Sequence, residues 1–252
     1  MSAPAETNEA PHTKKSRIFL GFLSVLALGF FALFLGLGIW QIERLQWKLD
    51  LIARVDARVH AEPVAAPGRD DWANVNQAED EYRHVALTGT YLNDKEVLVR
   101  ALTERGSGFW VLTPMRSDDG ALMFINRGFI PDAKRDPAAR TEMQVAGETT
   151  VNGLLRMPEP DGFFLRPNDP ERNEWNSRDV AAFAIKENLG TVAPYFIDAD
   201  AQSNTGNSPI GGLTVVTFRN NHLSYAITWF ALAAMVAGAA IFVWRHERKA
   251  ND

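Results

Sequence analysis

Two long apolar segments lie near the two ends of the chain, and a more polar segment lies between them. Residues 18–40 form an uncharged apolar run, and residues 223–244 form another. At about 1.5 Å rise per helical residue, each run reaches roughly 33 Å, enough to cross a hydrocarbon core of about 30 Å. The pattern predicts one transmembrane helix at each end and an extramembrane domain, residues 41–222, between them.

The first helix is expected to continue past the membrane. Apolar residues recur every three or four positions over 42–59, charged residues fill the opposite face, and Pro63 follows. We therefore expect one helix to about His60, with its apolar stripe packed against the rest of the domain. Within the membrane, Ala32-x-x-x-Gly36 and Ala234-x-x-x-Gly238 would let the two helices approach closely.

Between the helices, the hydrophobic period changes to two, which is typical of strands. Asp118-Asp119-Gly120 predicts a hairpin turn, because glycine accepts positive φ. Extended segments are predicted at 84–91, 97–99, 109–115, 122–130, 151–156, 195–197 and 214–218. Loops are predicted at 133–147, at 157–162 and, as a mobile linker, at 201–212.

One helix is predicted inside the domain, over residues 176–189. Asn176 can cap it, Asp179 would occupy its third position, and Gly190 would end it. Many strands with a single short helix favour an antiparallel sheet curled towards a barrel. The fold class is therefore an α+β membrane protein, with two transmembrane helices flanking an extracytoplasmic, mainly antiparallel β domain.

Basic residues set the expected orientation. They precede the first apolar run and follow the second: Lys14, Lys15, Arg17, Arg245, Arg248 and Lys249. Basic residues near membrane helices stay on the cytoplasmic side. We expect residues 1–17 to be a disordered cytoplasmic tail, residues 245–252 to be a second cytoplasmic tail, and the domain to lie outside.

A cleavable signal peptide is the alternative for the first run. The run exceeds the usual apolar core of about 7–15 residues, and no Ala-x-Ala-like site follows it. The first tail contains Glu6 and Glu9, unlike an Arg-rich transit peptide. These features favour a retained anchor in a bacterial inner membrane, with the lipid bilayer as one partner and a periplasmic domain.

The chain contains no cysteine, which excludes disulfides, zinc–thiolate sites, thiol redox chemistry and c-type haem attachment. No nucleophile elbow, Walker loop, dinucleotide fingerprint or His-Glu-x-x-His element occurs in the sequence. We therefore expect no enzymatic activity, and no nucleic-acid partner.

His222 stands out among the five histidines, because it lies where the second apolar run begins. A preceding Asn can cap this helix, and the positive end of the helix dipole favours a neutral imidazole, the form that ligates iron. An interfacial histidine bonded to a headgroup or water is the alternative. The others are expected in the tails or on the surface: His12, His60, His84 and His246.

Aromatic and basic residues recur near both membrane ends of the domain. Together they could frame a flat apolar ligand with anionic groups, through ring stacking and cation–carboxylate pairs. An ordinary interfacial belt, with Arg and Lys reaching headgroups, is the alternative. The candidates are Trp40, Arg44, Lys48, Arg219, Tyr225 and Trp229.

Four motifs occur in order along the chain. They are Gly38-x-Trp40-Gln41-x-x-Arg44-x-x-Trp47-Lys48; Tyr82-Arg83 through Gly89-x-Tyr91; Asn126-Arg127-Gly128-Phe129-Ile130-Pro131; and Asn220-x-His222-x-x-Tyr225-Ala226-x-x-Trp229-Phe230. In these motifs the chain resembles the Surfeit-locus-one (Shy-type) family of cytochrome c oxidase assembly factors, from about residue 18 to 245. The resemblance implies a role in maturing oxidase subunit I, and binding of haem a, with His222 as the candidate iron ligand.

The resulting hypothesis is a haem carrier. Rings of Trp40, Tyr225 and Trp229 would flank the porphyrin, while Arg44, with Arg219 or Lys48, would meet its propionates. The outside domain would dock on subunit I or on haem a synthase. A scaffold that holds subunit I without binding haem is the main alternative. A copper chaperone is a third, against which the absence of cysteine argues, because Cu(I) favours soft ligands.

Overall fold

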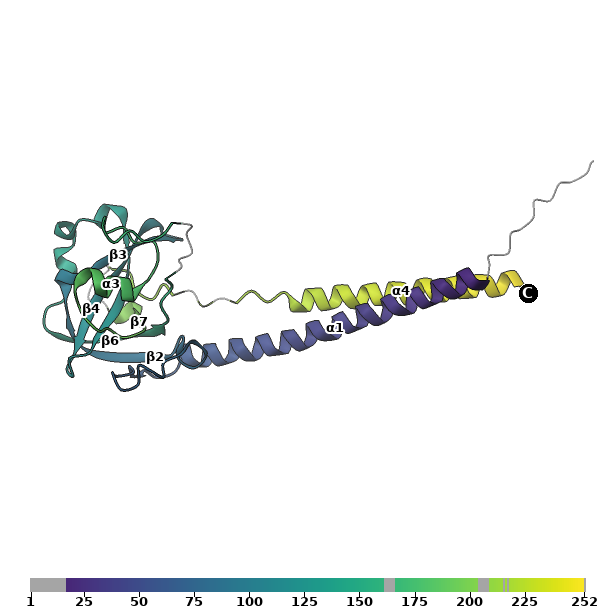
Figure 1. Cartoon of the computed structure of the whole chain (residues 1–252), viewed down its shortest axis with the longest axis horizontal. Helices are drawn as coiled ribbons and strands as arrows, with labels where there is room; N and C mark the ends of the chain where they lie inside the picture. Colours follow the sequence, from purple (N-terminus) through teal and green to yellow (C-terminus); the bar gives the residue numbers. More distant parts are fainter. Residues whose placement is uncertain (1–16, 161–165, 204–208, 215, 217, 252) are drawn as a thin grey trace, which may run out of the picture. The chain divides into compact units, whose positions relative to one another are not determined.

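The computed structural model describes residues 17–160, 166–203, 209–214, 216 and 218–251. The chain divides into two compact units, shown in Figure 1. The first unit contains the described residues up to Leu51 and those from Phe218 onward, and the second unit spans Ile52–Thr217.

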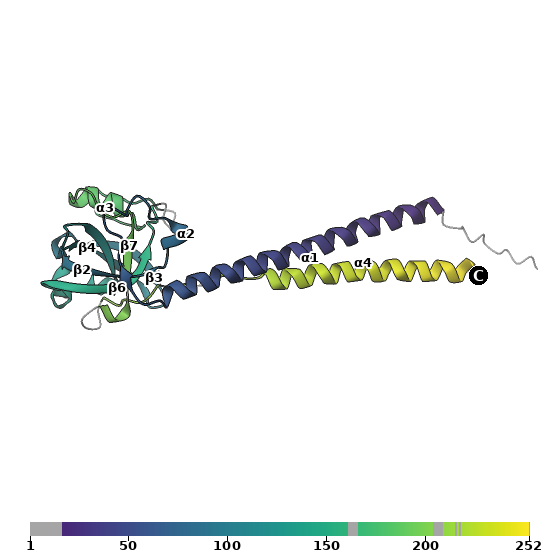
Figure 2. The same cartoon turned by 90° about the horizontal axis from the view of Figure 1, so that it is seen from below.

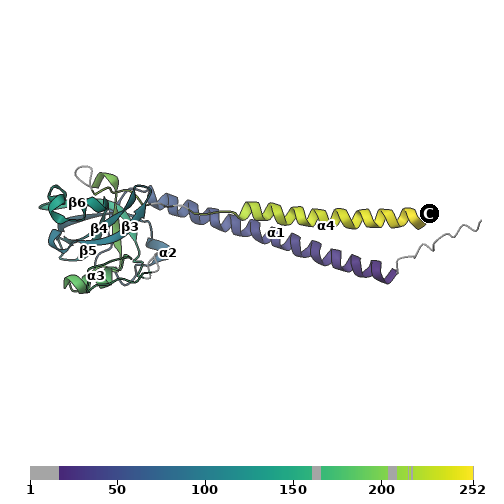
Figure 3. The same ribbon diagram turned by 90° about the horizontal axis from the view of Figure 1, so that it is seen from above.

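The first unit consists of two long helices, α1 (Arg17–Val59), of which the part up to Leu51 belongs here, and α4 (His222–Asn251). They run antiparallel, close together near the start of α4 and farther apart towards the N-terminal end of α1 (Figures 2 and 3). Both are long and apolar enough to cross a membrane, which confirms the two predicted membrane helices. Helix α1 ends one residue before the predicted His60.

The helices of this unit meet near Gly38. A Cβ added there would lie 2.6 Å from the Phe230 ring, so the missing side chain allows the close approach. The Phe34 and Trp229 rings stack 5.7 Å apart between centroids, and Ala226 is buried. The small residues of the two predicted motifs do not make this contact, because each of them is exposed: Ala32, Gly36, Ala234 and Gly238.

Among its described residues, the second unit is built on one sheet of seven strands. Their order is β1-β2-β6-β7-β5-β4-β3, and β2 also pairs with β4, so five strands close into a barrel. All pairs are antiparallel except β1 with β2 and β5 with β7. The strands are β1 (Val64–Ala65), β2 (His84–Tyr91), β3 (Val97–Thr103), β4 (Gly106–Ser117), β5 (Leu122–Pro131), β6 (Glu148–Arg156) and β7 (Phe196–Ala199). The predicted barrel-like domain is confirmed.

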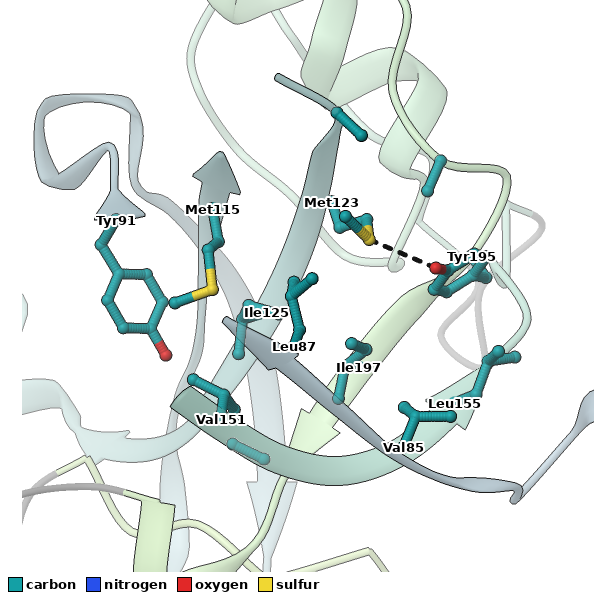
Figure 4. Close-up of a cluster of buried hydrophobic side chains, with 13 residues drawn as sticks. Val85, Leu87, Tyr91, Met115, Met123, Ile125, Val151, Leu155, Tyr195 and Ile197 are labelled. Carbon is teal, nitrogen blue, oxygen red and sulfur yellow. Dashed lines mark hydrogen bonds between the residues drawn. The ribbon is translucent and has the colours of Figure 1, made fainter. Parts of the chain in front are cut away.

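Alternate residues of the barrel strands fill its interior, as Figure 4 shows. Val85 of β2, Ile125 of β5 and Ile197 of β7 are fully buried together. The Tyr195 hydroxyl, also buried, donates to the Pro67 carbonyl (2.6 Å) and contacts Met123 Sδ (3.2 Å). Apolar side chains therefore fill the interior, and the Tyr195 hydroxyl has a hydrogen-bond acceptor.

Short helices connect the strands. Helix α3 (Val180–Glu187) packs Phe183 edge-on against Phe124 and Trp175, in a second apolar cluster on the outside of the barrel. The others are α2 (Gln77–Asp80) and the 3-10 turns η1 (Asn93–Lys95), η2 (Asp132–Lys134), η3 (Pro137–Met143) and η4 (Ala201–Ser203). The predicted loop 133–147 thus contains η3 and most of η2.

The cap of α3 differs from the prediction. Asp179, not Asn176, is the N-cap: its carboxylate accepts from the Ala182 amide (3.0 Å). Asn176 instead donates to the Pro167 carbonyl (2.9 Å). The helix ends at Glu187, and its C-cap is Asn188 in the left-handed region (φ 54°), before the expected glycine.

Two other segments also differ from the prediction. Of the predicted strand 214–218, Thr214, Val216 and Phe218 are not in a strand, and residues 215 and 217 lie outside the described part. Within the predicted linker, Ile210 pairs with Phe129 of β5 (both N–O distances 2.9 Å). Residues 204–208 of that linker, and 161–162 of the preceding predicted loop, lie outside the described part.

Candidate functional site

His222 is the first residue of α4, and its imidazole meets α1. Its Nδ1 lies 2.7 Å from Gln41 Oε1. A carbonyl oxygen only accepts hydrogen bonds, so Nδ1 is the donor; in the neutral imidazole with this tautomer, the lone pair is on Nε2. The side chain of Asn220, two residues before the start of α4, accepts from the His222 amide (3.4 Å).

The packing of the two helices explains why Gln41 and His222 meet. Gln41 follows Gly38 by three residues, which places both on one face of α1. Ala226 follows His222 by four residues and is buried on the same face of α4. Gln41 is 9% exposed. A buried amide needs a hydrogen-bond partner, and the imidazole supplies one.

The predicted cations lie against aromatic rings. The Arg44 guanidinium is 4.9 Å from the centre of the Trp47 ring and 6.0 Å from that of Trp40. Lys48 Nζ is 4.8 Å from the Phe218 ring. These are cation–π contacts, and both indoles remain about half exposed.

The other candidates are placed separately. Trp229 stacks on Phe34, whereas Tyr225 and Arg219 are exposed. Within the described part of the chain, no hydrogen bond or ring contact joins Trp40, Tyr225 or Arg219 to His222. The structure thus brings Trp40 into contact with Arg44, and His222 into contact with Gln41. It does not bring all the predicted site residues together around His222.

The donor set fits a haem iron better than a metal held by protein ligands alone. The described residues contain no group of three or more His, Asp or Glu side chains suited to a metal ion. A porphyrin itself supplies four nitrogen ligands to the iron, so the protein needs to provide only an axial ligand, such as one neutral imidazole. A hydrogen bond to the second ring nitrogen orients such ligands, and Gln41 Oε1 holds the Nδ1 of His222 by a bond of this kind.

Gln41 was not among the site residues proposed from the sequence. It directly follows the first apolar run and lies one helical turn after Gly38, so a face-sharing argument could have selected it. Its partner across the helix pair could not be read from that spacing.

Known proteins match nearly the whole chain. The SURF1 family model matches residues 28–234. The chain belongs to the SURF1 family. Surfeit locus protein 1 of Homo sapiens is 39% identical over 226 residues, covering 83% of this chain and 72% of that protein. That of Rattus norvegicus is 38% identical over 259 residues (96% and 79%), and a SURF1-like protein of Monosiga brevicollis is 39% identical over 223 residues (83% of each).

The SURF1 match includes the residues through which α1 and α4 contact each other. Gln41 and His222 lie inside the matched range, as does the complete barrel. This confirms the resemblance inferred from the four motifs. The SURF1 match is thus to the architecture as a whole, and not to one of its two units.

Proposed function

We propose that this protein assists the assembly of cytochrome c oxidase by binding haem a through His222 and aiding its insertion into subunit I. Membership of the SURF1 family supports the role in oxidase assembly. The observation that supports haem binding is the Gln41–His222 hydrogen bond, because a partner at Nδ1 orients the ring and leaves Nε2 as the nitrogen that would ligate iron.

The place of His222 in the chain suits a lipid-soluble cargo. Haem a carries a long isoprenoid tail, so it partitions into the bilayer, and His222 begins a helix long enough to cross that bilayer. His222 would hold the haem, which when bound would supply an iron that accepts the imidazole nitrogen. His222 would hold the iron loosely enough for release to subunit I.

The remaining site residues have proposed roles around the porphyrin. Trp40 and Tyr225 are exposed enough to stack on it, and Trp229 lies two turns beyond His222 on the same helix face. Arg44, Lys48 and Arg219 are the proposed partners of the propionates. To reach a propionate, the Arg44 guanidinium would have to move away from the Trp40 and Trp47 rings. Lys48 follows Gln41 by seven residues and therefore lies on the same face of α1.

The proposed location is a bacterial inner membrane, with both tails in the cytoplasm and the barrel in the periplasm. The basic residues beyond each membrane helix support this orientation. From that side, the barrel would dock on subunit I or on haem a synthase.

Haem titration of the purified full chain tests the proposal. Wild type should give a saturable Soret change, and His222→Ala should abolish it. Gln41→Leu should weaken binding by about 10–100-fold, because loss of the partner that orients a ligand has effects of that size. His246→Ala, at the other end of α4, is the matched control and should bind like wild type.

Two outcomes would contradict haem binding. One is an unchanged haem complement in His222→Ala purified from a host that makes haem a. The other is a wild-type chain with no saturable Soret change that still supports oxidase assembly, which would establish the scaffold instead.

A further inference from the structure

A cavity of about 380 Å³ lies in the barrel unit, between β3 and the segment that carries η2 and η3. This volume falls within the range of small-molecule sites, about 300–1,000 Å³. Four arginines line it: Arg100 of β3, Arg127 of β5, Arg135 after η2, and Arg140 in η3. In a chain of net charge −5, they form a local concentration of positive charge.

Arg140 is one of the two buried arginines among the described residues that line this cavity. It is 5% exposed, pairs with Glu96, and donates to the Arg135 carbonyl (3.2 Å). The backbone leaves helical geometry at this residue (φ −135°, ψ 19°). Its buried Nε has no hydrogen-bond partner among the residues described. More than about 90% of buried polar groups are paired, so this donor indicates an acceptor supplied from outside the chain.

Arg127 adds positive charge beside it. Its guanidinium lies 4.9 Å from the Tyr91 ring, and its pKa is lowered chiefly by burial, with the like charge of Arg140 acting in the same direction. Burial raises the pKa of Tyr91 to about 12, so this phenol stays neutral and supplies no countercharge near pH 7. An anion in the cavity would offset both the desolvation and the repulsion.

Arg100 and Arg135 are exposed and available for a ligand. In the described structure neither forms an ion pair, and Arg135 lies over the Phe109 ring (5.3 Å). Phe109 and the buried Trp175 add an apolar wall. Guanidinium groups suit phosphate and carboxylate, which they bind through two parallel hydrogen bonds.

Acidic residues limit the charge of such a ligand. Asp94 and Glu174 also line the cavity, and Glu96 is occupied by Arg140. A polyanion would be repelled by these carboxylates, whereas one phosphate or carboxylate group can lie among the arginines. A cation is disfavoured by the four guanidinium groups.

We propose that this cavity binds a small molecule through one oxyanion, a phosphate or a carboxylate, held by Arg100, Arg135 and Arg140. The body of the molecule packs against Phe109 and Trp175. The site is separate from His222 and does not depend on haem binding.

Calorimetric titration of the full chain in detergent tests this, with inorganic phosphate, glycerol phosphate and succinate as probes. We expect saturable binding of a phosphate or of the carboxylate probe. Arg100→Gln and Arg135→Gln should each weaken it by about tenfold or more, the effect of one lost charge-assisted hydrogen bond. Arg116→Gln, an exposed arginine of β4 outside the cavity, is the control and should bind like wild type.

The probes also distinguish the sources of the oxyanion. Tighter binding of glycerol phosphate than of inorganic phosphate supports an organic phosphate that uses the apolar wall, and preference for succinate supports a carboxylate. The proposal is overturned if no probe binds saturably to wild type, or if Arg116→Gln weakens binding as much as Arg100→Gln and Arg135→Gln do.

Discussion

At the residue scale, hydrogen-bond partners decide what a histidine can do. His222 has an acceptor at Nδ1, the Gln41 side-chain carbonyl oxygen, which fixes the direction in which its Nε2 points. His84 has acceptors at both nitrogens: the Ala61 carbonyl 2.7 Å from Nδ1 and the Asp200 carboxylate 2.8 Å from Nε2. Only an imidazolium can donate both bonds. The sequence predicted a surface role for His84, but the structure buries it partly and pairs it.

The pairing of His84 predicts a pH-dependent stability of the barrel. Burial alone lowers the pKa of His84, but the bonds to Ala61 and Asp200, with the nearby charge of Glu62, raise it more, so its net pKa lies above the usual 6.5. The stabilisation is therefore complete below about pH 6.5 and is lost as pH rises through the folded-state pKa. Urea unfolding at several pH values should show this decline in wild type and not in His84→Gln. Equal declines in both proteins would assign it to another group.

Only those features of the candidate site that depend on neighbouring residues in the sequence could be predicted. The position of His222 after an Asn and before an apolar run identified it from the sequence alone. Gln41 and His222 are 181 positions apart in the sequence. Their contact depends on which faces of α1 and α4 pack together, and no local sequence pattern determines that. For the same reason, the gathering of Arg100, Arg135 and Arg140 became visible only once β3 and η3 were in place.

At the element scale, the periodicity of the sequence predicted most helices and strands, but not how the barrel closes. Strand β2 was evident from its alternation over 84–91. Its pairing with both β6 and β4, and the parallel insertion of β7 beside β5, join residues far apart in sequence. The cap of α3 was misplaced because Asn176 and Asp179 are both good caps, and a local count does not choose between them.

Gly89 is the position at which barrel closure can be tested. It pairs with Ser117 of β4 and with Thr149 of β6, and a Cβ there would lie 2.3 Å from the Arg116 carbonyl oxygen. Because that oxygen belongs to the backbone, Gly89→Ala should lower the free energy of unfolding by about 1–3 kcal/mol. Urea unfolding followed by near-ultraviolet circular dichroism measures this.

Gly68→Ala is the matched control for that measurement. Nothing lies within 4 Å of a Cβ at Gly68, and its φ is outside the left-handed region, so stability should be unchanged or raised by up to about 1 kcal/mol. If the two variants were equally stable, the tight crossing of β2 and β4 would not be a determinant of closure.

At the scale of the whole molecule, the two units expose different surfaces. Among the described residues, most of the exposed large apolar side chains belong to α1 and α4, and those of the barrel unit are Val64, Leu102 and Ile185. The barrel buries its apolar residues and adds a buried ion network, in which Arg156 binds Glu81 (2.8 Å) and Asp198 (3.0 Å). This division is the one expected of a lipid-facing helix pair and a water-facing domain.

The lack of cysteine makes the proposed orientation directly measurable, because one introduced thiol is the only one in the chain. Asp118→Cys lies in the exposed β4–β5 turn, and Lys249→Cys lies among the basic residues that end α4. Basic residues retained in the cytoplasm predict that a membrane-impermeant maleimide modifies Asp118→Cys in spheroplasts. The same reagent should modify Lys249→Cys only after lysis, and labelling of Lys249→Cys in intact spheroplasts would reverse the orientation and place the barrel, with its arginine-lined cavity, in the cytoplasm.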